Sequence, residues 1–198
     1  QLAMRTAQIL YVRLVSALGT VSFAAHQIAI NVESLSYMPG WGFAVAATTM
    51  VGQYLGAERE ELAEESGYES WKLGASVMGL MAVVFFFFPE YLVRLYTDDP
   101  QIIKMAAGNL RIIAFAQIPM GTQFIFAGAL RGAGDTRPVF YSTMIGNWLG
   151  RLGGAYLLLK YFGLGLTGAW LAMCFDWVIR GIYVWLRYRK GNWKKIQV

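Results

Sequence analysis

The stretch SLSYMPGWGFAVAATTMVGQYLGA, residues 34–57, decides the fold class of this chain, because it contains no charged residue. Residues 112–130 form a second uncharged run. An α-helix needs roughly 20 mainly apolar residues to span the hydrocarbon core of a bilayer. Further apolar runs follow with short connections between them. The sequence therefore predicts an all-α integral membrane protein.

The composition of the whole chain supports this class. Among its 198 residues, 57% are hydrophobic and 15% are charged, whereas a soluble domain carries about 25% charged residues. The formal net charge is +5, and the basic residues gather at predicted helix ends and near the C-terminus. This distribution is typical of segments beside anionic lipid headgroups. Nucleic acid is not expected as a partner, because no basic face is interleaved with exposed aromatic residues in a polar context.

Glycine, proline and N-cap signals divide the chain into six predicted helices. The helices cover about residues 2–18, 23–54, 63–88, 101–131, 139–160 and 166–189. They form one six-helix transmembrane lobe, residues 1–190, followed by a basic cytoplasmic tail, residues 191–198. The chain begins at Gln1 rather than Met, and we expect it to be part of a longer protein.

Lysine and arginine are unequally distributed between the two sets of connections. On the side of the N-terminus, residues 58–65, residues 131–138 and the C-terminal segment hold Arg59, Arg131, Arg137, Arg187, Arg189, Lys190, Lys194 and Lys195. The opposite connections hold mainly Arg94, Lys104 and Lys160. Because short loops rich in Lys and Arg stay in the cytoplasm, both termini of this segment are predicted to be cytoplasmic.

A polar stripe follows one face of the second predicted helix. Gln27, Asn31, Ser34 and Met38 are spaced i, i+4, i+7 and i+11, so they share a face. A polar stripe beside small residues suits a water-filled passage, and it suits interhelical hydrogen bonding equally well. Both interpretations stay open. His26, near the start of the helix, is interpreted as a structural histidine with satisfied hydrogen bonds rather than a ligand.

Ionisable side chains inside a membrane are costly unless they are paired or hydrated. For Glu33 we favour a structural ion pair, with Arg13 or Arg151, over a role in proton or cation coupling. Asp176 and Arg180 stand four residues apart, so they are expected to satisfy each other within one helix.

No enzymatic signature is found in the sequence. It contains no Gly-rich phosphate loop, no paired histidines of a zinc protease and no nucleophilic serine elbow. We predict no catalytic residue and no cofactor. Energy for transport is expected to come from an ion gradient, or from a part of the protein outside this chain.

Four motifs resemble the C-terminal lobe of the multidrug and toxic compound extrusion (MATE) transporters. They are AAHQIAIN at 24–31, MPG at 38–40, VGQYLGA at 51–57 and GALRGAGDT at 128–136. The resemblance covers essentially the whole chain. It implies one lobe of a two-lobed transporter in the inner or plasma membrane, related to its partner lobe by an approximate two-fold axis.

The resemblance also implies a function. Members of the family exchange H⁺ or Na⁺ for cationic, amphipathic compounds by alternating access. The expected partners are the lipid bilayer, an N-terminal six-helix lobe and such compounds. Two alternatives stay open: a flippase for lipid-linked precursors within the same superfamily, and a membrane interaction module that transports nothing.

Site residues follow from the same resemblance. Some branches of the family place coupling carboxylates in this lobe, but the aligned positions fall near Met4 and Met120, neither of which is acidic. The coupling site for H⁺ or Na⁺ is therefore expected in the N-terminal lobe, and no metal ligand is predicted here. The residues expected to line the substrate cavity are Gln27, Asn31, Ser34, Met38, Met120, Gln123 and Asn147.

Overall fold

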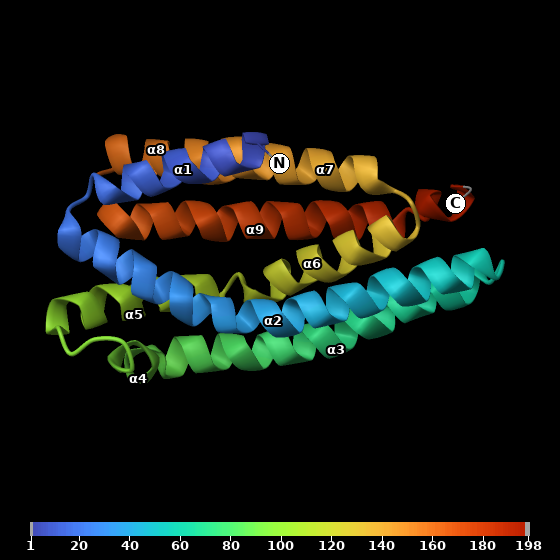
Figure 1. Ribbon diagram of the computed structural model, residues 1–198, viewed down its shortest axis with the longest axis horizontal. Coiled ribbons are helices and arrows are strands. Elements are labelled where there is room, and N and C mark those ends of the chain that lie inside the picture. The colour runs from blue at the N-terminus through green and yellow to red at the C-terminus, as the bar shows by residue number, and fades with distance from the viewer. Residues whose placement is uncertain (1, 197–198) are drawn as a thin grey trace. The chain divides into compact units, whose positions relative to one another are not determined.

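The computed structural model describes residues 2–196, with side chains from Arg5 onward. Every regular element in that part of the chain is helical, which confirms the all-α prediction (Figure 1). In chain order the elements are α1 (Leu2–Ser16), α2 (Thr20–Gly56), α3 (Glu60–Phe87), α4 (Pro89–Arg94), α5 (Pro100–Ala114), α6 (Gln117–Gly132), α7 (Thr136–Ile145), the π-helix η1 (Gly146–Gly153), α8 (Gly154–Lys160), α9 (Gly165–Arg189) and the 3₁₀-helix η2 (Asn192–Lys195).

The helix predicted over residues 101–131 is two helices in the structure. α5 and α6 are separated by Phe115 and Ala116. Pro119 accounts for this break, because its ring lacks an N–H donor and collides with the carbonyl four residues earlier, that of Phe115. A proline does not always have this effect: α2 continues through Pro39.

The helix predicted over residues 139–160 begins earlier, at Thr136, and its middle part is the π-helix η1. A π-helix bonds each N–H to the carbonyl five residues back, so its turns are wider than those of an α-helix. The wide turn approaches α9 closely at Gly150. A Cβ atom at Gly150 would lie 3.3 Å from the side chain of Asp176, so the glycine permits this approach.

Two described helices, α3 and α9, are individually long and apolar enough to cross a membrane. The pair α5 and α6 would be a third span if the two are counted as one. The prediction that six helices cross the bilayer stays a prediction for the others.

The described residues divide into two compact units. Unit 1 consists of residues 2–35, 81–116 and 144–176, and unit 2 consists of residues 36–80, 117–143 and 177–196.

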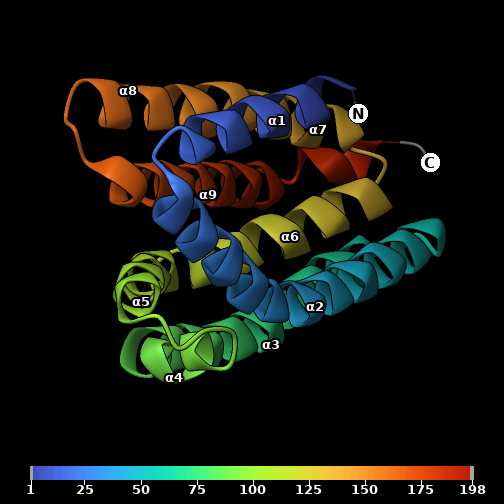
Figure 2. The same ribbon diagram turned by 60° about the vertical axis from the view of Figure 1, so that its left-hand side comes forward.

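In unit 1, α1 lies alongside η1 and α8, and the short α4 packs on α5 (Figures 1 and 2). The start of α5 is capped by Asp99, whose carboxylate accepts a 2.8 Å hydrogen bond from the Gln101 N–H. Arg111 on α5 donates to Glu90 at 3.3 Å and to the Phe86 carbonyl at 3.4 Å. These bonds hold α4 and the end of α3 against α5.

In unit 2, α6 packs on α2 through two glycines four residues apart. A Cβ atom at Gly128 would lie 2.4 Å from the Ala44 carbonyl oxygen, and one at Gly132 would lie 2.2 Å from that of Thr48. Small residues at this spacing let two membrane helices approach backbone to backbone. The contact explains why glycine stands at both positions of the GALRG sequence.

The core of unit 2 contains an aromatic cluster, which we define as Tyr68, Trp71, Phe126, Tyr188 and Trp193. The rings of Tyr188 and Trp193 stack with centroids 4.7 Å apart, and Phe126 lies 4.8 Å from Tyr188.

Three members of this cluster, Trp71, Tyr188 and Trp193, form side-chain hydrogen bonds. Trp193 Nε1 donates to the Tyr188 carbonyl at 2.7 Å, and the Tyr188 hydroxyl donates to the Ala63 carbonyl at 3.2 Å. Trp71 Nε1 donates to Thr122 Oγ1 at 2.9 Å.

The segment predicted as a basic tail, residues 191–198, is packed in part. Trp193 is fully buried in the aromatic cluster, and Lys194 forms an ion pair with Glu64 on α3. The apolar indole explains why this stretch folds back, although lysines flank it. Residues 197–198 lie outside the described part of the chain.

Candidate functional site

A polar pocket of about 220 Å³ lies within unit 1. Four elements contribute to it: α1, α2, η1 and α9. Its lining residues are Ala7, Gln8, Tyr11, Val12, His26, Gln27, Ile30, Asn147, Arg151 and Met173. The pocket brings together Gln27, Asn147 and Arg151, which the sequence analysis singled out separately.

His26 is the most buried titratable group that lines the polar pocket, with 3% of its surface exposed. Its ring lies edge-on to Trp170, with centroids 5.7 Å apart, and 5.9 Å from the Tyr11 ring. The Tyr11 hydroxyl donates to the Ala169 carbonyl at 3.1 Å. Nδ1 of His26 has no hydrogen-bond partner among the described residues. The interpretation of His26 as a structural histidine rather than a ligand stays a prediction.

Arg151 forms an ion pair with Asp176. Nη2 of Arg151 lies 3.3 Å from Oδ2 of Asp176, and the aspartate side chain is completely buried. Attraction between such charges is strong where water is excluded, and it offsets the cost of burying them. The pair leaves the polar pocket with no excess charge from these two residues.

The π-helix η1 presents both Asn147 and Arg151 to the polar pocket. π-helical turns are rare and are frequently found at functional sites. The two residues are four apart, so they lie on nearby parts of the same face. The local widening of the helix thus places an amide and a guanidinium beside His26.

The polar stripe on α2 is exposed in this chain. Gln27, Asn31 and Ser34 are exposed, and Met38 has 80% of its surface accessible. The Ser34 hydroxyl donates to the Asn31 carbonyl at 2.6 Å, a local bond that leaves the Asn31 amide available. An exposed amide on a membrane helix is costly against lipid, so this face requires water or another polar surface.

Met120 and Gln123, predicted as cavity residues, are buried in unit 2. Met120 is completely buried, and Gln123 has 4% of its surface exposed. The physical reason is that most residues of α6 are buried, so its polar side chains also lie within the unit. A ligand on the surface of this chain cannot reach the buried Met120. We therefore leave Met120 and Gln123 out of the candidate site.

The other predicted ionisable residues are also buried. Glu33 on α2 is completely buried, and Arg180 has 4% of its surface exposed. The Arg180 guanidinium lies 4.2 Å from the Trp177 ring centroid, a cation–π contact. The pairings proposed for Glu33 and for Asp176 with Arg180 stay predictions, and the partner identified for Asp176 is Arg151.

Sequence reasoning missed Gln8, Tyr11 and Met173 as pocket residues. A signal was present for two of them, since Gln8 and Tyr11 are three residues apart on a short apolar helix and so share a face. Met173 lies in a continuous apolar run, where nothing in the sequence distinguishes it.

No group of three His, Cys, Asp or Glu side chains within residues 2–196 is placed to hold a metal ion. The side chain of Met4, near one aligned coupling position, lies outside the described side chains.

Comparison with known proteins identifies the family. The MatE family model matches residues 1–157. The chain is 37% identical over 190 residues to a probable multidrug resistance protein NorM of Thermotoga maritima. This alignment covers 96% of the chain and 41% of that protein. It is 36% identical over 180 residues to the multidrug resistance protein MdtK of Yersinia pestis, covering 89% of the chain and 39% of the relative.

Solved structures share the fold. An outward-facing multidrug resistance MATE family transporter of the MOP superfamily superposes with a TM-score of 0.87 at 20% identity, covering 99% of this chain and 45% of that one. A MATE crystal structure in the straight conformation gives 0.88 at 21% identity, with 99% and 44% covered. The chain spans about two fifths of the length of the curated relatives it matches. Its described residues are all-α, and the chain belongs to the MatE family.

Proposed function

We propose that this chain is the C-terminal half of a secondary active multidrug exporter, which exchanges H⁺ or Na⁺ for cationic, amphipathic compounds by alternating access. The relatives named as multidrug resistance proteins support the substrate class. The protein acts as a transporter rather than an enzyme. It resides in the inner or plasma membrane, with both termini of this segment on the cytoplasmic side.

The observation that carries the proposal is the exposed polar face of α2. Gln27, Asn31 and Ser34 are accessible on α2, whereas the ionisable His26 and Glu33 of the same helix are buried. In the proposed protein this face borders a passage shared with an N-terminal six-helix lobe. Amide and hydroxyl oxygens there accept hydrogen bonds from a cationic compound without holding it as tightly as a carboxylate would.

The flippase alternative is less well supported. A carrier of phosphate-linked lipids needs unpaired cations in its passage. Arg111 is paired with Glu90, and Arg151 is paired with Asp176. These pairings reduce the positive charge available to a phosphate, so the drug exporter is the better supported function.

Dye export from membrane vesicles that contain the intact protein tests the proposal. Asn31→Leu is expected to lower ion-driven ethidium export roughly fivefold, the effect of one lost hydrogen bond. The matched control is Gln101→Leu, which replaces an exposed polar residue on α5 and should leave export unchanged. Equal export by both variants, at equal expression, would return the stripe to a structural role.

The same vesicles locate the coupling site, which we propose lies in the N-terminal lobe. Glu33→Gln is expected to retain the dependence of export on a H⁺ or Na⁺ gradient. If the gradient no longer drives export in this variant, Glu33 is the coupling residue and the site lies in this lobe.

A further inference from the structure

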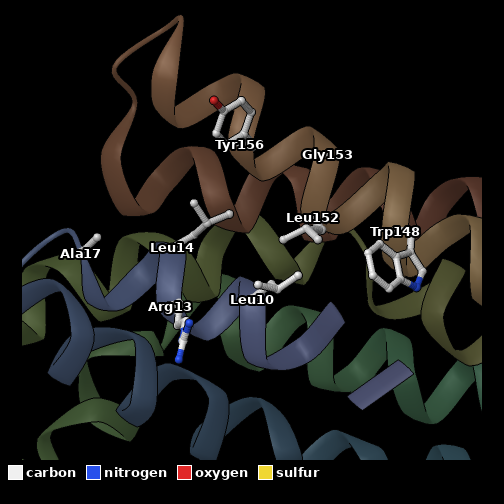
Figure 3. A pocket seen from close by; sticks show the side chains of 8 residues that line it. All are labelled: Leu10, Arg13, Leu14, Ala17, Trp148, Leu152, Gly153 and Tyr156. Carbon is white, nitrogen blue, oxygen red and sulfur yellow. The ribbon is translucent and has the colours of Figure 1, made fainter. Parts of the chain in front are cut away.

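Unit 1 contains a second hollow, an apolar groove of about 500 Å³ between α1 and the segment η1–α8 (Figure 3). Leu10 and Leu14 contribute to it from α1, and Leu152 and Tyr156 contribute from the facing segment. The complete lining is Leu10, Arg13, Leu14, Ala17, Trp148, Leu152, Gly153 and Tyr156. Arg13 is the one charged residue among them.

The apolar groove and the polar pocket use different faces of the same π-helix. Asn147 and Arg151 line the pocket, whereas Trp148 and Leu152 line the groove. The two hollows share no lining residue. The groove is therefore a separate site with a different chemical character.

The surface beside the groove is of the kind that faces lipid. Ile9 on α1, Leu149 on η1 and Leu157 on α8 are all exposed, with 71% of Leu149 accessible. An exposed apolar surface of this kind is expected where a membrane protein contacts acyl chains. It contrasts with the exposed amides of the α2 stripe in the same unit.

One end of the groove is cationic. Arg13 lies in the last turn of α1 and lines the groove, and Lys160 lies in the last turn of α8, four residues after the groove residue Tyr156. Lys160 Nζ donates to the hydroxyl of the groove residue Tyr156 at 2.8 Å. In the described part of the chain neither cation forms an ion pair with an acidic side chain.

We propose that this groove binds an anionic phospholipid. One acyl chain lies against Leu10, Leu14 and Leu152, and the phosphate of the headgroup lies near Arg13 and Lys160. Cations at the end of an apolar groove attract the phosphate of an anionic headgroup by Coulomb attraction. The same cations repel cationic, amphipathic compounds, so the groove differs from the proposed drug passage. The inference does not depend on the transport function.

Lipid retention by the intact protein tests this site. After delipidation in detergent, the protein is offered phosphatidylglycerol and phosphatidylcholine with identical acyl chains, and bound lipids are counted by native mass spectrometry. The unaltered protein should retain phosphatidylglycerol preferentially. Arg13→Gln with Lys160→Gln should weaken that retention roughly thirtyfold, the usual effect of two cations near anionic lipid.

The matched control is Arg94→Gln with Lys104→Gln, which removes two cations of unit 1 from a different hollow. It should retain phosphatidylglycerol as the unaltered protein does. An equal loss in the two double variants would mean that net charge alone attracts the lipid, and would overturn the proposal. Equal retention of phosphatidylcholine by the unaltered protein would overturn it as well.

A second pair of variants tests the position of the acyl chain. Leu152→Trp fills the groove and should reduce phosphatidylglycerol retention, whereas Leu149→Trp adds the same ring at an exposed position outside the groove lining and should not. If Leu152→Trp retains the lipid fully, the chain does not lie in this groove. Displacement of the lipid by ethidium would identify the groove as a drug route instead.

Discussion

The aromatic cluster of unit 2 and the polar pocket of unit 1 both bury polar side chains, but they differ in how those groups are satisfied. In the cluster, Trp193 Nε1 and the Tyr188 hydroxyl both donate to carbonyls. In the pocket, Nδ1 of His26 and Nε1 of the neighbouring Trp170 have no hydrogen-bond partner among the described residues. Leaving a buried polar atom unsatisfied is costly. The two regions therefore differ in the share of their buried polar atoms that the protein itself hydrogen-bonds.

The largest expected effect concerns the ion pair of the polar pocket. Asp176→Asn removes the completely buried carboxylate that pairs with the partly buried Arg151 guanidinium, which should lower the free energy of unfolding by about 3–5 kcal/mol. Thermal unfolding of the purified protein measures this loss.

A control with the same chemistry is Glu90→Gln, which removes the partner of Arg111 at the same 3.3 Å separation but from an exposed pair. Its effect should stay below about 1 kcal/mol. The double variant Arg151→Met with Asp176→Leu should recover most of the lost stability, because neither charge of this pair remains. Equal losses for Asp176→Asn and Glu90→Gln would show that burial does not distinguish the two pairs.

An intermediate effect is expected where α6 meets α2 in unit 2. Gly128→Ala places a methyl group against the Ala44 carbonyl and should cost about 1–3 kcal/mol. Gly42→Ala is the matched control, because a Cβ atom at this position of the partner helix α2 meets open space. It should be neutral or stabilising, since alanine favours a helix more than glycine does. A larger loss for Gly42→Ala would contradict the close packing of α6 on α2.

The smallest expected effect concerns single polar atoms of the aromatic cluster and of the polar pocket. Tyr188→Phe removes a hydroxyl that is bonded to the Ala63 carbonyl, and should cost about 1 kcal/mol. His26→Phe removes a ring nitrogen that has no partner, so its cost in stability should be smaller while dye export falls. If His26→Phe destabilises the protein more than Tyr188→Phe does, the pocket is a structural element after all.

Local sequence signals predicted the helices and the exposed stripe, since both depend on residues within one helix. Gln27, Asn31 and Ser34 were placed on one face by spacing alone, and the structure exposes all three. Proline was ambiguous, because Pro119 stands four residues after a helix break whereas Pro39 lies inside an uninterrupted helix.

Contacts between different helices could not be predicted from local sequence signals. The i, i+4 rule predicts a pair of Asp176 with Arg180, and that pair stays a prediction. Arg151 also pairs with Asp176, and no local rule selects it because it lies on another element. The sequence did not predict the burial of Gln123. Most residues of α6 are buried, so this helix has no exposed polar face opposite a buried apolar one. The π-helix was missed because its bonding pattern leaves no distinct hydrophobic period.

The π-helix η1 couples the two hollows of unit 1, because its residues line both the apolar groove and the polar pocket. Rewinding its wide turn to α-helical geometry would shift the register by one residue, a rotation of about 100° for everything that follows. Asn147 could then not stay in the pocket while Trp148 stays in the groove. Binding of a ligand in one hollow would therefore change the shape of the other. Hydrogen exchange at the amides of residues 150–154 tests this coupling. Phosphatidylglycerol should slow the exchange, and added ethidium should change the size of that slowing. If neither compound alters exchange there, the segment is a rigid spacer.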